Sequence, residues 1–381
     1  MAEPFKNLLN AGLVAGAAAH LGRQWPAFDG RRFVAQATHG LDALEMKARA
    51  MQIADALEAT LPPRFADAAA LIEAALAPAE AGDAMAQLEG LQQGLRGWIL
   101  WPVGEFVARR GLAEPERALA ALHAITQRFT AEFAIRPFIV EHPRLVFETL
   151  ARWTTDPSHH VRRLVSEGSR PRLPWGLQLK SLIRDPGPTL PLLRALQDDP
   201  SEYVRRSVAN HLNDIAKDHP AQVAAWLHEH LPDASAERRA LLRHASRTLI
   251  KAGDAAVLEA WGLGRPFRGD AALSVSPRRI PLGEAVTLAL RLRSTAATAQ
   301  RLVIDYAVHH VKADGSTSPK VFKGWTLELP ARGEVALEKR HAVRPITTRR
   351  YFAGRHRVVV QVNGRAVAEA AFDLVLTPRP P

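Results

Sequence analysis

Apolar residues recur at three- and four-residue spacing from the start of the chain to about residue 265, with Pro and Asp at the breaks. This spacing lines one face of a helix with apolar side chains. It predicts an amphipathic helix within 8–21, a helix that opens at Leu41 and stops before Pro62, and a helix pair at 130–139 and 143–153. Helices of this length joined by short turns indicate an all-α region.

An internal repeat lies within this helical region. The segment 156–163, Asp-Pro-Ser-His-His-Val-Arg-Arg, recurs 43 residues later at 199–206 as Asp-Pro-Ser-Glu-Tyr-Val-Arg-Arg, and a looser copy occupies 236–242. Asp-Pro-Ser is typical of a turn that ends in a helix N-cap. A period near 40 predicts a HEAT-type α-solenoid. On the repeat alone, its arginines are interpreted as solvated surface residues.

After Pro266 the pattern changes to an alternation of apolar and polar residues. Segments 274–277, 285–292, 302–308 and 356–362 read as strands, and Asn363-Gly364 is a strong hairpin signal. Seven or so short strands in about 110 residues suggest an immunoglobulin-like β-sandwich. The predicted fold class is therefore mainly α, a right-handed HEAT-like α-solenoid over 1–265 followed by an all-β sandwich over 271–381, with the boundary within 262–270.

Length and composition limit the class of protein. The chain has 381 residues, of which 47% are hydrophobic and 23% charged, as in ordinary globular proteins of two or three domains. No window reaches 18 uninterrupted apolar residues, so no membrane contact is expected. The absence of Cys excludes disulfides, thiolate metal sites and a Cys nucleophile. The apolar run 8–21 lacks a positive leader and a distinct cleavage site, so a cytoplasmic protein is expected.

Positive charge is concentrated in the C-terminal part of the chain. The net charge is +11, and residues 271–381 hold 18 Lys and Arg against 8 Asp and Glu. Such a field favours a polyanion, most simply nucleic acid. In the sandwich the basic residues gather in predicted loops, and loops that carry Arg and Tyr can grip phosphates; the best candidates are Arg349, Arg350, Tyr351, Arg355 and His356. A soluble basic protein without such a partner is the alternative.

Signals for nucleotide or metal chemistry are missing from the sequence. It has no Gly-rich phosphate loop, no dinucleotide fingerprint and no Gly-x-Ser-x-Gly elbow. His228 and His230 diverge at i, i+2 on a helix and are interpreted as solvated, whereas His309 and His310 point to opposite faces of a strand. We expect neither a metal nor a cofactor.

The segment 166–176 is unusual for a structural repeat. Gly168 and two prolines break the helix and place Trp175 on a loop, and Glu167 sits where the helix ends. One repeat later Asp214 lies in mid-helix, and Glu132 lies among aromatic residues. Three carboxylates from three successive helical layers would therefore meet in a basic surround.

Each of these residues also has a structural interpretation. Asp214 could pair with Lys217 or Arg206, Glu167 could brace the Gly168 turn, and Glu132 could be a buried partner of Arg136. Trp175 could belong to the core, and Arg206 could equal its twin Arg163 in importance for phosphates.

At these residues the sequence resembles the AlkC branch of the HEAT-like DNA alkylation-repair glycosylases, relatives of AlkD. The similarity covers nearly the whole chain and is carried by segments 2–7, 129–138, 167–175 and 207–214. The appended sandwich is similar to that of the AlkC subgroup with an immunoglobulin-like domain. The resemblance implies excision of N3-methylated bases, 3-methyladenine and 3-methylcytosine, from duplex DNA, without a metal or a nucleotide cofactor.

The resemblance also implies roles for single residues. Glu167 and Asp214 are the expected catalytic pair with Glu132 as the third carboxylate, and either Asp214 or Glu167 positions the water. Trp175 would stack on the lesion nucleotide, and Arg163 would clamp a flanking phosphate. Further DNA contacts are expected at Arg170, Arg206 and Lys217.

The carboxylates suit the chemistry that the resemblance implies. They stabilise developing positive charge on the sugar and polarise water, and an aromatic face supports a cation. We expect an open cleft with little deep pocket, and a monomer. The alternative function is a non-catalytic HEAT-repeat scaffold that binds nucleic acid or a protein partner.

Overall fold

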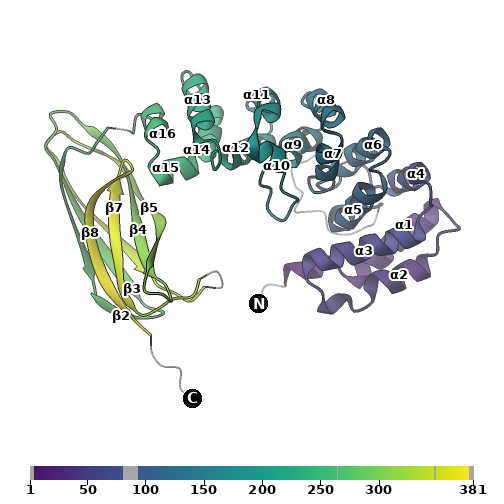
Figure 1. Ribbon diagram of the computed structural model, residues 1–381, viewed down its shortest axis with the longest axis horizontal. Coiled ribbons are helices and arrows are strands. Elements are labelled where there is room, and N and C mark those ends of the chain that lie inside the picture. Colours follow the sequence, from purple (N-terminus) through teal and green to yellow (C-terminus); the bar gives the residue numbers. More distant parts are fainter. Residues whose placement is uncertain (1–3, 80–92, 264, 347–348, 377–381) are drawn as a thin grey trace, which may run out of the picture. The chain divides into compact units, whose positions relative to one another are not determined.

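The computed structural model describes residues 4–79, 93–263, 265–346 and 349–376. The chain divides into two compact units: residues 1–218 and 235–245 form the first, and residues 219–234 and 246–381 form the second. The first unit is helical, and the second joins helices to a β-sandwich (Figure 1). The predicted fold class, helices followed by an all-β sandwich, is confirmed.

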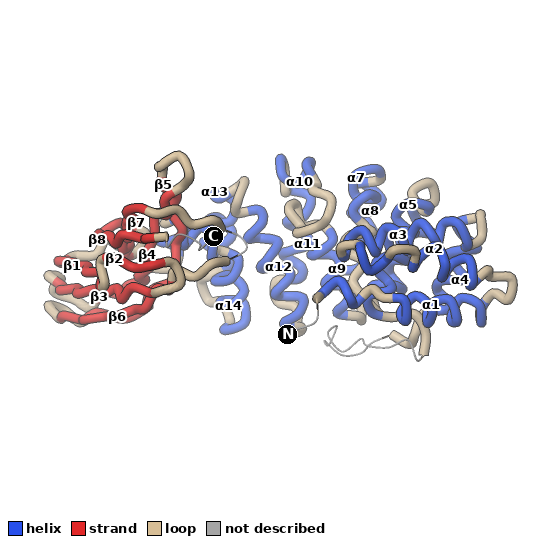
Figure 2. The backbone as a smooth tube through the Cα atoms, turned by 90° about the horizontal axis from the view of Figure 1, so that it is seen from below, coloured by secondary structure: helices blue, strands red, loops and turns tan. Residues whose placement is uncertain are grey.

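The first unit is a row of helices. Neighbouring pairs include α6 on α9, α9 on α12, and α12 on α14, so that each repeat packs on the next (Figure 2). The helices are α1 (Ala11–Gln24), α2 (Gly30–Thr38), α3 (Met46–Thr60), α4 (Phe65–Ala75), α5 (Leu100–Arg110), α6 (Pro115–Thr126), α7 (Arg136–Glu141), α8 (Pro143–Trp153), α9 (His159–Gly168), α10 (Lys180–Arg184), α11 (Leu190–Leu196), α12 (Glu202–Ile215) and α14 (Ala236–Ala245). Short 3-10 turns are η1 (Phe5–Leu8), η2 (Leu41–Ala43), η4 (Gly97–Ile99) and η5 (Gly187–Thr189).

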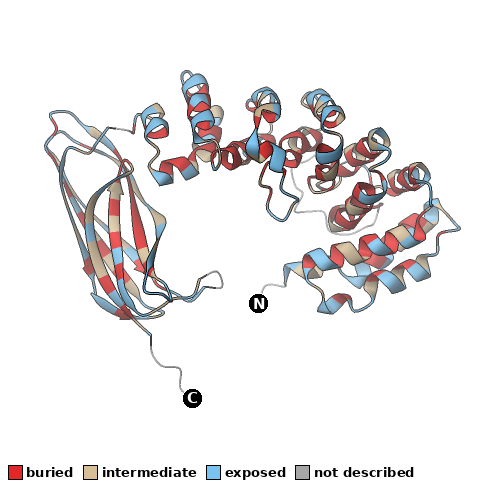
Figure 3. Ribbon diagram, viewed as in Figure 1, coloured by how far each residue is buried: buried red, intermediate tan, exposed pale blue. Residues whose placement is uncertain are grey.

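Each helix of the row buries the apolar stripe that the sequence pattern predicts (Figure 3). Among the described residues, no helix is long and apolar enough to cross a membrane.

Two predicted helices differ from the structure at their starts. The helix expected to open at Leu41 begins at Met46, after the separate turn η2. The helix expected over 130–139 forms only from Arg136, because Pro137 fits the first turn of a helix and the preceding residues 130–135 turn instead. Glu132 therefore lies on a loop and not on a helix.

The repeated Asp-Pro-Ser motif forms the same turn twice. Ser158 and Ser201 stand at the N-caps of α9 and α12 as predicted, but their hydroxyls make no capping bond. The aspartates accept the hydrogen bonds instead: Asp156 Oδ1 from the Ser158 amide at 2.8 Å, and Asp199 Oδ1 from the Ser201 amide at 2.9 Å. The motif is thus an aspartate turn that starts each helix.

The first arginine of each Arg-Arg pair holds its own turn closed. Arg162 donates to the carbonyls of Asp156 and Pro157, and Arg205 donates to those of Asp199 and Pro200. Arg162 and Arg205 therefore stabilise the two turns. Arg163 and Arg206, the second arginines of the pairs, take no part in these hydrogen bonds.

The described residues of the second unit form three helices and eight strands. The two sheets have strand orders β1-β3-β6 and β2-β8-β7-β4-β5, and the named pairs are antiparallel except β2 with β8. The elements are α13 (Pro220–His230), α15 (Arg247–Ala252), α16 (Ala255–Ala260), β1 (Gly269–Ser276), β2 (Arg279–Pro281), β3 (Ala285–Ser294), β4 (Gln300–Val311), β5 (Thr317–Leu329), β6 (Glu334–Ala342), β7 (Gly354–Val362) and β8 (Arg365–Val375).

The Asn-Gly signal marks the turn between β7 and β8, where Asn363 and Gly364 have φ of 49° and 76°. A Cβ on Gly364 would lie 2.6 Å from the Gly253 Cα, so the α15–α16 turn packs directly on this hairpin. The last helix ends at Ala260 and the first strand begins at Gly269. The division into compact units nevertheless places the last two helices, α15 and α16, in the same unit as the sandwich.

Three histidines are buried inside the sandwich. His310 on β4 and His356 on β7 lie with their ring centroids 5.4 Å apart, and His341 on β6 hydrogen-bonds to the Tyr306 hydroxyl across the two sheets. Burial, with the charge of Arg349, lowers the pKa of His310 to about 3 and of His341 to about 4, and burial also lowers the pKa of His356. The folded sandwich therefore holds all three neutral near pH 7.

We expect the sandwich to lose stability as the pH falls from 6.5 toward 4. The unfolded histidines bind protons near pH 6.5 and the folded ones do not, so unfolding gains protons in this window. By pH 5, His310 and His341 each lower the stability of the sandwich by about 2 kcal/mol. Hydrogen exchange of β4 and β7 in the full chain measures this loss. A His310→Phe variant with the same pH dependence as wild type would contradict the assignment of His310.

Candidate active site

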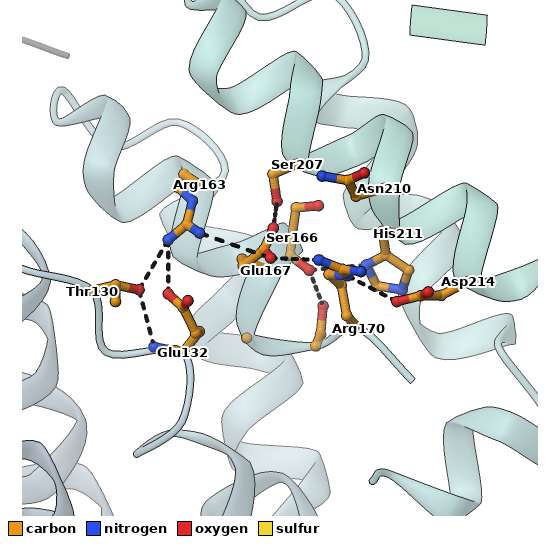
Figure 4. A network of polar contacts seen from close by, with 12 residues as sticks. Thr130, Glu132, Arg163, Ser166, Glu167, Arg170, Ser207, Asn210, His211 and Asp214 are labelled. Atoms are coloured by element: carbon orange, nitrogen blue, oxygen red, sulfur yellow. Dashed lines mark hydrogen bonds and ion pairs between the residues drawn. The ribbon is translucent and has the colours of Figure 1, made fainter. Parts of the chain in front are cut away.

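An alternating ladder of acidic and basic side chains crosses three layers of the first unit (Figure 4). Arg163 Nη1 donates to Glu132 Oε2 at 2.7 Å, and its Nη2 lies 3.8 Å from Glu167 Oε1. Arg170 Nη1 donates to Glu167 Oε1 at 2.6 Å and its Nε to Asp214 Oδ2 at 2.8 Å. The structure thus brings together the three carboxylates that the sequence singles out. We call these five residues the charge ladder.

The two ends of the charge ladder are tied to neighbouring groups. Lys217 Nζ donates to Asp214 Oδ1 at 2.8 Å, and the Thr130 hydroxyl accepts from Arg163 Nη1 at 2.9 Å. In the middle, the Ser207 hydroxyl donates to Glu167 Oε2 at 2.6 Å. Buried charges are tolerated when each is paired and hydrogen-bonded in this way.

The repeat positions these side chains. Arg163 and Glu167 lie one turn apart on α9, Arg170 follows the end of that helix, and Asp214 lies on α12, the next helix of the row. Gly168 lets the end of α9 approach the loop that carries Glu132, because a Cβ there would lie 2.6 Å from Ile135 Cγ2. The absence of a side chain at Gly168 therefore permits the close approach of α9 to the loop of residues 130–135.

The basic residues determine the ionisation of the carboxylates. Although burial favours the neutral acid, Arg163 and Arg170 outweigh it and lower the pKa of Glu167. Burial outweighs the charge of Arg163 at Glu132 and raises the pKa of that carboxyl. Of the side chains that the structure describes, only Arg163 donates a hydrogen bond to the Glu132 carboxylate. Glu167 is thus a fixed anion, and Glu132 has the higher proton affinity.

Arg136 connects the charge ladder to the Trp175 loop. Its guanidinium is fully buried, and it donates through Nη1 to the Gly168 carbonyl at 2.9 Å and through Nε to the Leu177 carbonyl. The predicted pairing of Glu132 with Arg136 is not formed, since Glu132 binds Arg163. Arg136 instead holds the end of α9 and the loop after it in one arrangement.

Trp175 is exposed and its backbone is strained. Its side chain is 64% exposed and its φ is 65°, in the left-handed region that large side chains rarely adopt. Its ring lies nearly parallel to that of Trp101, with centroids 6.4 Å apart. Trp175 is therefore not a core residue, unlike Trp101 and Trp226, which are buried.

His211 supports the turn that carries Glu167. Its Nδ1 donates to the Ser166 carbonyl at 2.9 Å, and burial lowers its pKa to about 4. The ring is neutral near pH 7 and does not add positive charge beside Asp214.

The residues predicted to contact DNA differ in their surroundings. Arg163 and Arg170 direct their hydrogen bonds to the carboxylates and hold the charge ladder. Arg206 is exposed and lines a groove of about 440 Å³ between α12 and α14, together with Arg205 and His244. Lys217 keeps 44% of its side chain exposed beyond Asp214.

In the sandwich, one predicted contact is wrong. His356 is fully buried, because the alternation of β7 turns its side chain into the core against Phe372. Arg350 and Arg355 are exposed, and Arg349 and Tyr351 are partly so. In α13, His230 is likewise buried against Trp226 rather than solvated.

Sequence reasoning missed four residues that build this site: Arg136, Ser166, Ser207 and His211. Three of them lie on the same helices as the carboxylates, close to them in sequence. Arg136 precedes a proline at a helix start, which gives no sign of burial. Only the fold shows that its guanidinium reaches two backbone carbonyls.

Comparisons with known proteins agree along the chain. Family models described as "DNA alkylation repair enzyme" and as the C-terminal Ig-like domain of the uncharacterised protein YhaZ match residues 128–249 and 270–376. YhaZ of Bacillus subtilis is 33% identical over 97% of this chain and 99% of its own. The alkylpurine DNA glycosylase AlkC of Pseudomonas fluorescens, solved with DNA containing an abasic site analog, is 34% identical with a TM-score of 0.87, covering 98% of this chain and 100% of that one.

Proposed function

Since this chain belongs to the AlkC-type family of DNA alkylation repair glycosylases, we propose that it hydrolyses the N-glycosidic bond of cationic N3-methylated bases in duplex DNA. The preferred substrates are 3-methyladenine and 3-methylcytosine, and the products are the methylated base and an abasic site. The charge ladder carries this proposal, because it brings three carboxylates together and holds them with two arginines. The non-catalytic scaffold is not retained, because the chain is a DNA glycosylase.

The proposed reaction needs stabilisation of positive charge more than acid catalysis. A base methylated at N3 is cationic and leaves as a neutral molecule, so no proton has to be donated to it. The sugar becomes electron-poor as the bond to the base breaks, and an adjacent anion lowers the energy of that state. Arg163 and Arg170 hold Glu167 as such an anion, and Asp214 accepts hydrogen bonds from Arg170 and Lys217.

Attack by water completes the reaction. The water oxygen bonds to C1′ of the sugar, the electron pair of the C1′–N bond stays with the base, and the water loses a proton. Glu132 suits the acceptor of that proton because burial raises its pKa and its hydrogen bonding is the least occupied of the three. Glu167 or Asp214 then orients the water or stabilises the sugar.

DNA is the partner implied by the family, and the AlkC structure was solved with DNA bound. We propose that the phosphates of a duplex contact exposed basic residues on each unit, with the chain acting as a monomer. In the first unit these are Arg206 and Lys217. In the second they are Arg349, Arg350, Tyr351 and Arg355, which the basic charge of the sandwich supports.

Replacement of Arg206 by Gln is expected to weaken DNA binding at low salt and to reduce its salt dependence. Loss of one phosphate contact makes the slope of log K against log salt less steep by about 1. A fluorescence anisotropy titration at several salt concentrations measures the slope. Arg144→Gln, at an exposed arginine of α8, is the matched control that leaves the slope unchanged. An equal effect of both substitutions would refute a specific role for Arg206.

The proposed substrate class is tested by the bases that the enzyme releases. Methylated duplex DNA is incubated with the full chain, and free bases are separated and identified. Release of 3-methyladenine and 3-methylcytosine, with little release of uncharged bases, is expected. A preference for neutral bases would reject the role given to substrate charge.

A further inference from the structure

Two large aromatic side chains that lie far apart in the sequence of the first unit are exposed side by side. Phe5 is 48% exposed and Trp175 is 64% exposed, and their ring centroids lie 6.2 Å apart. Exposure of single apolar residues is ordinary, but contiguous exposed aromatics are typical of binding sites. The contact is between the N-terminal turn η1 and the loop after α9.

The Phe5 ring belongs to a cluster of aromatic rings. It packs edge-to-face on Trp98 with centroids 4.7 Å apart, and Trp98 contacts Trp101. Trp101 is buried, lies parallel to Trp175 and stacks on Phe133, which follows Glu132 in the sequence. The exposed members of the cluster are Phe5 and Trp175.

The turn that carries Phe5 is held firmly. Arg49, whose side chain is almost fully buried, donates through Nη1 to the Leu9 carbonyl at 2.8 Å and to the Lys6 carbonyl at 3.2 Å. Lys6 also pairs with Glu45 at 2.9 Å. A buried arginine committed to two carbonyls of a terminal turn fixes the position of Phe5 on Trp98, which is the preorganisation that a binding residue needs.

We propose that Phe5 is a substrate-contacting residue that, with Trp175, forms the face against which the methylated base stacks. This inference rests on the proposed function. The faces of aromatic rings attract cations and stack on nucleobases. A cationic N3-methylated base is both a cation and a nucleobase, so it gains from each interaction. The exposed ring of Phe5 enlarges the aromatic area that the Trp175 ring offers to a base.

The test separates an aromatic contact from simple packing. Phe5→Leu keeps an apolar side chain on Trp98 but removes the ring face, whereas Phe5→Tyr keeps both. Release of 3-methyladenine from duplex DNA is followed under multiple turnover, and the melting temperature of each variant is measured. Phe28→Leu is the control, because Phe28 is a buried aromatic of the same unit whose ring contacts are Trp25 and Phe33.

Phe5→Leu is expected to lower kcat/KM about fivefold or more, mainly through KM, with a melting temperature close to that of wild type. Phe5→Tyr is expected to stay within about twofold of wild type, and Phe28→Leu to lower the melting temperature without a change in KM.

Unchanged kcat/KM in Phe5→Leu would overturn the proposal, and so would a loss that follows the melting temperature, because both assign Phe5 to packing. These outcomes leave base release by the wild type intact. Absence of base release by the wild type would instead reject the proposed function, and the Phe5 assignment with it.

Discussion

Glu167→Gln is expected to slow base release roughly 100- to 1000-fold while DNA binding changes little. The substitution removes one negative charge beside the developing sugar cation, and loss of one such electrostatic contact at an active site costs about 3–4 kcal/mol. Glutamine keeps one oxygen to accept from Arg170, and its amide N–H can donate to the Ser207 hydroxyl, so the end of α9 is expected to stay in place. Single-turnover release of 3-methyladenine measures the rate.

A second buried carboxylate provides the matched control. Asp199 is 6% exposed and binds Arg162 through both oxygens, at 2.6 and 2.9 Å, in the same row of helices but outside the charge ladder. Asp199→Asn is expected to lower the melting temperature and to leave the single-turnover rate unchanged. Equal rate losses in Glu167→Gln and Asp199→Asn would show that buried charge supports the fold and not the reaction.

Arg136→Met is expected to destabilise the protein and to impair base release more than its effect on stability explains. Methionine fills part of the space but leaves the Gly168 and Leu177 carbonyls without their donor, and each unsatisfied buried carbonyl costs about 1–3 kcal/mol. The loop that carries Trp175 then loses its connection to α9. Chemical denaturation gives the free energy of unfolding, and steady-state kinetics at a permissive temperature give KM and kcat.

Arg162→Met is the control for this substitution, since Arg162 also serves two backbone carbonyls but holds the turn before α9. We expect both variants to lose stability and only Arg136→Met to raise KM. Arg136→Lys, which keeps a donor, is expected to recover part of the activity. A KM for Arg136→Met equal to that for Arg162→Met would contradict a positioning role for Arg136.

The sequence predicts the architecture well because local patterns specify it. Helical periodicity, the Asp-Pro-Ser turns and the Asn363-Gly364 hairpin are all short-range signals, and the structure shows each in place. The helix predicted over 130–135 is wrong because helical spacing of apolar residues does not distinguish a helix from a turn that buries the same residues. The loop that forms there brings Glu132 to Arg163 of α9, which lies some 30 residues further along the chain.

At the candidate site, the sequence identifies the carboxylates but not what holds them. Glu132 lies among aromatic residues, Glu167 at a helix end and Asp214 in mid-helix, and the family resemblance gives these three residues a catalytic role. Arg170 looks like a surface cation in sequence, and only the packing of α9 on α12 shows that it bridges Glu167 and Asp214. The prediction that His356 contacts DNA is wrong. The basic residues around it suggested a loop, whereas it lies in strand β7 with its side chain turned into the core.

We propose that the charge ladder performs glycosidic hydrolysis of cationic methylated bases. Single-turnover release of 3-methyladenine from methylated duplex DNA by wild type and by Asp214→Asn tests this role, with binding to duplex DNA containing an abasic-site analogue measured on the same samples. We expect release by the wild type, a rate at least 100-fold lower in Asp214→Asn, and binding within threefold of wild type. Full release by Asp214→Asn, or no release by a wild type that binds DNA, would contradict it.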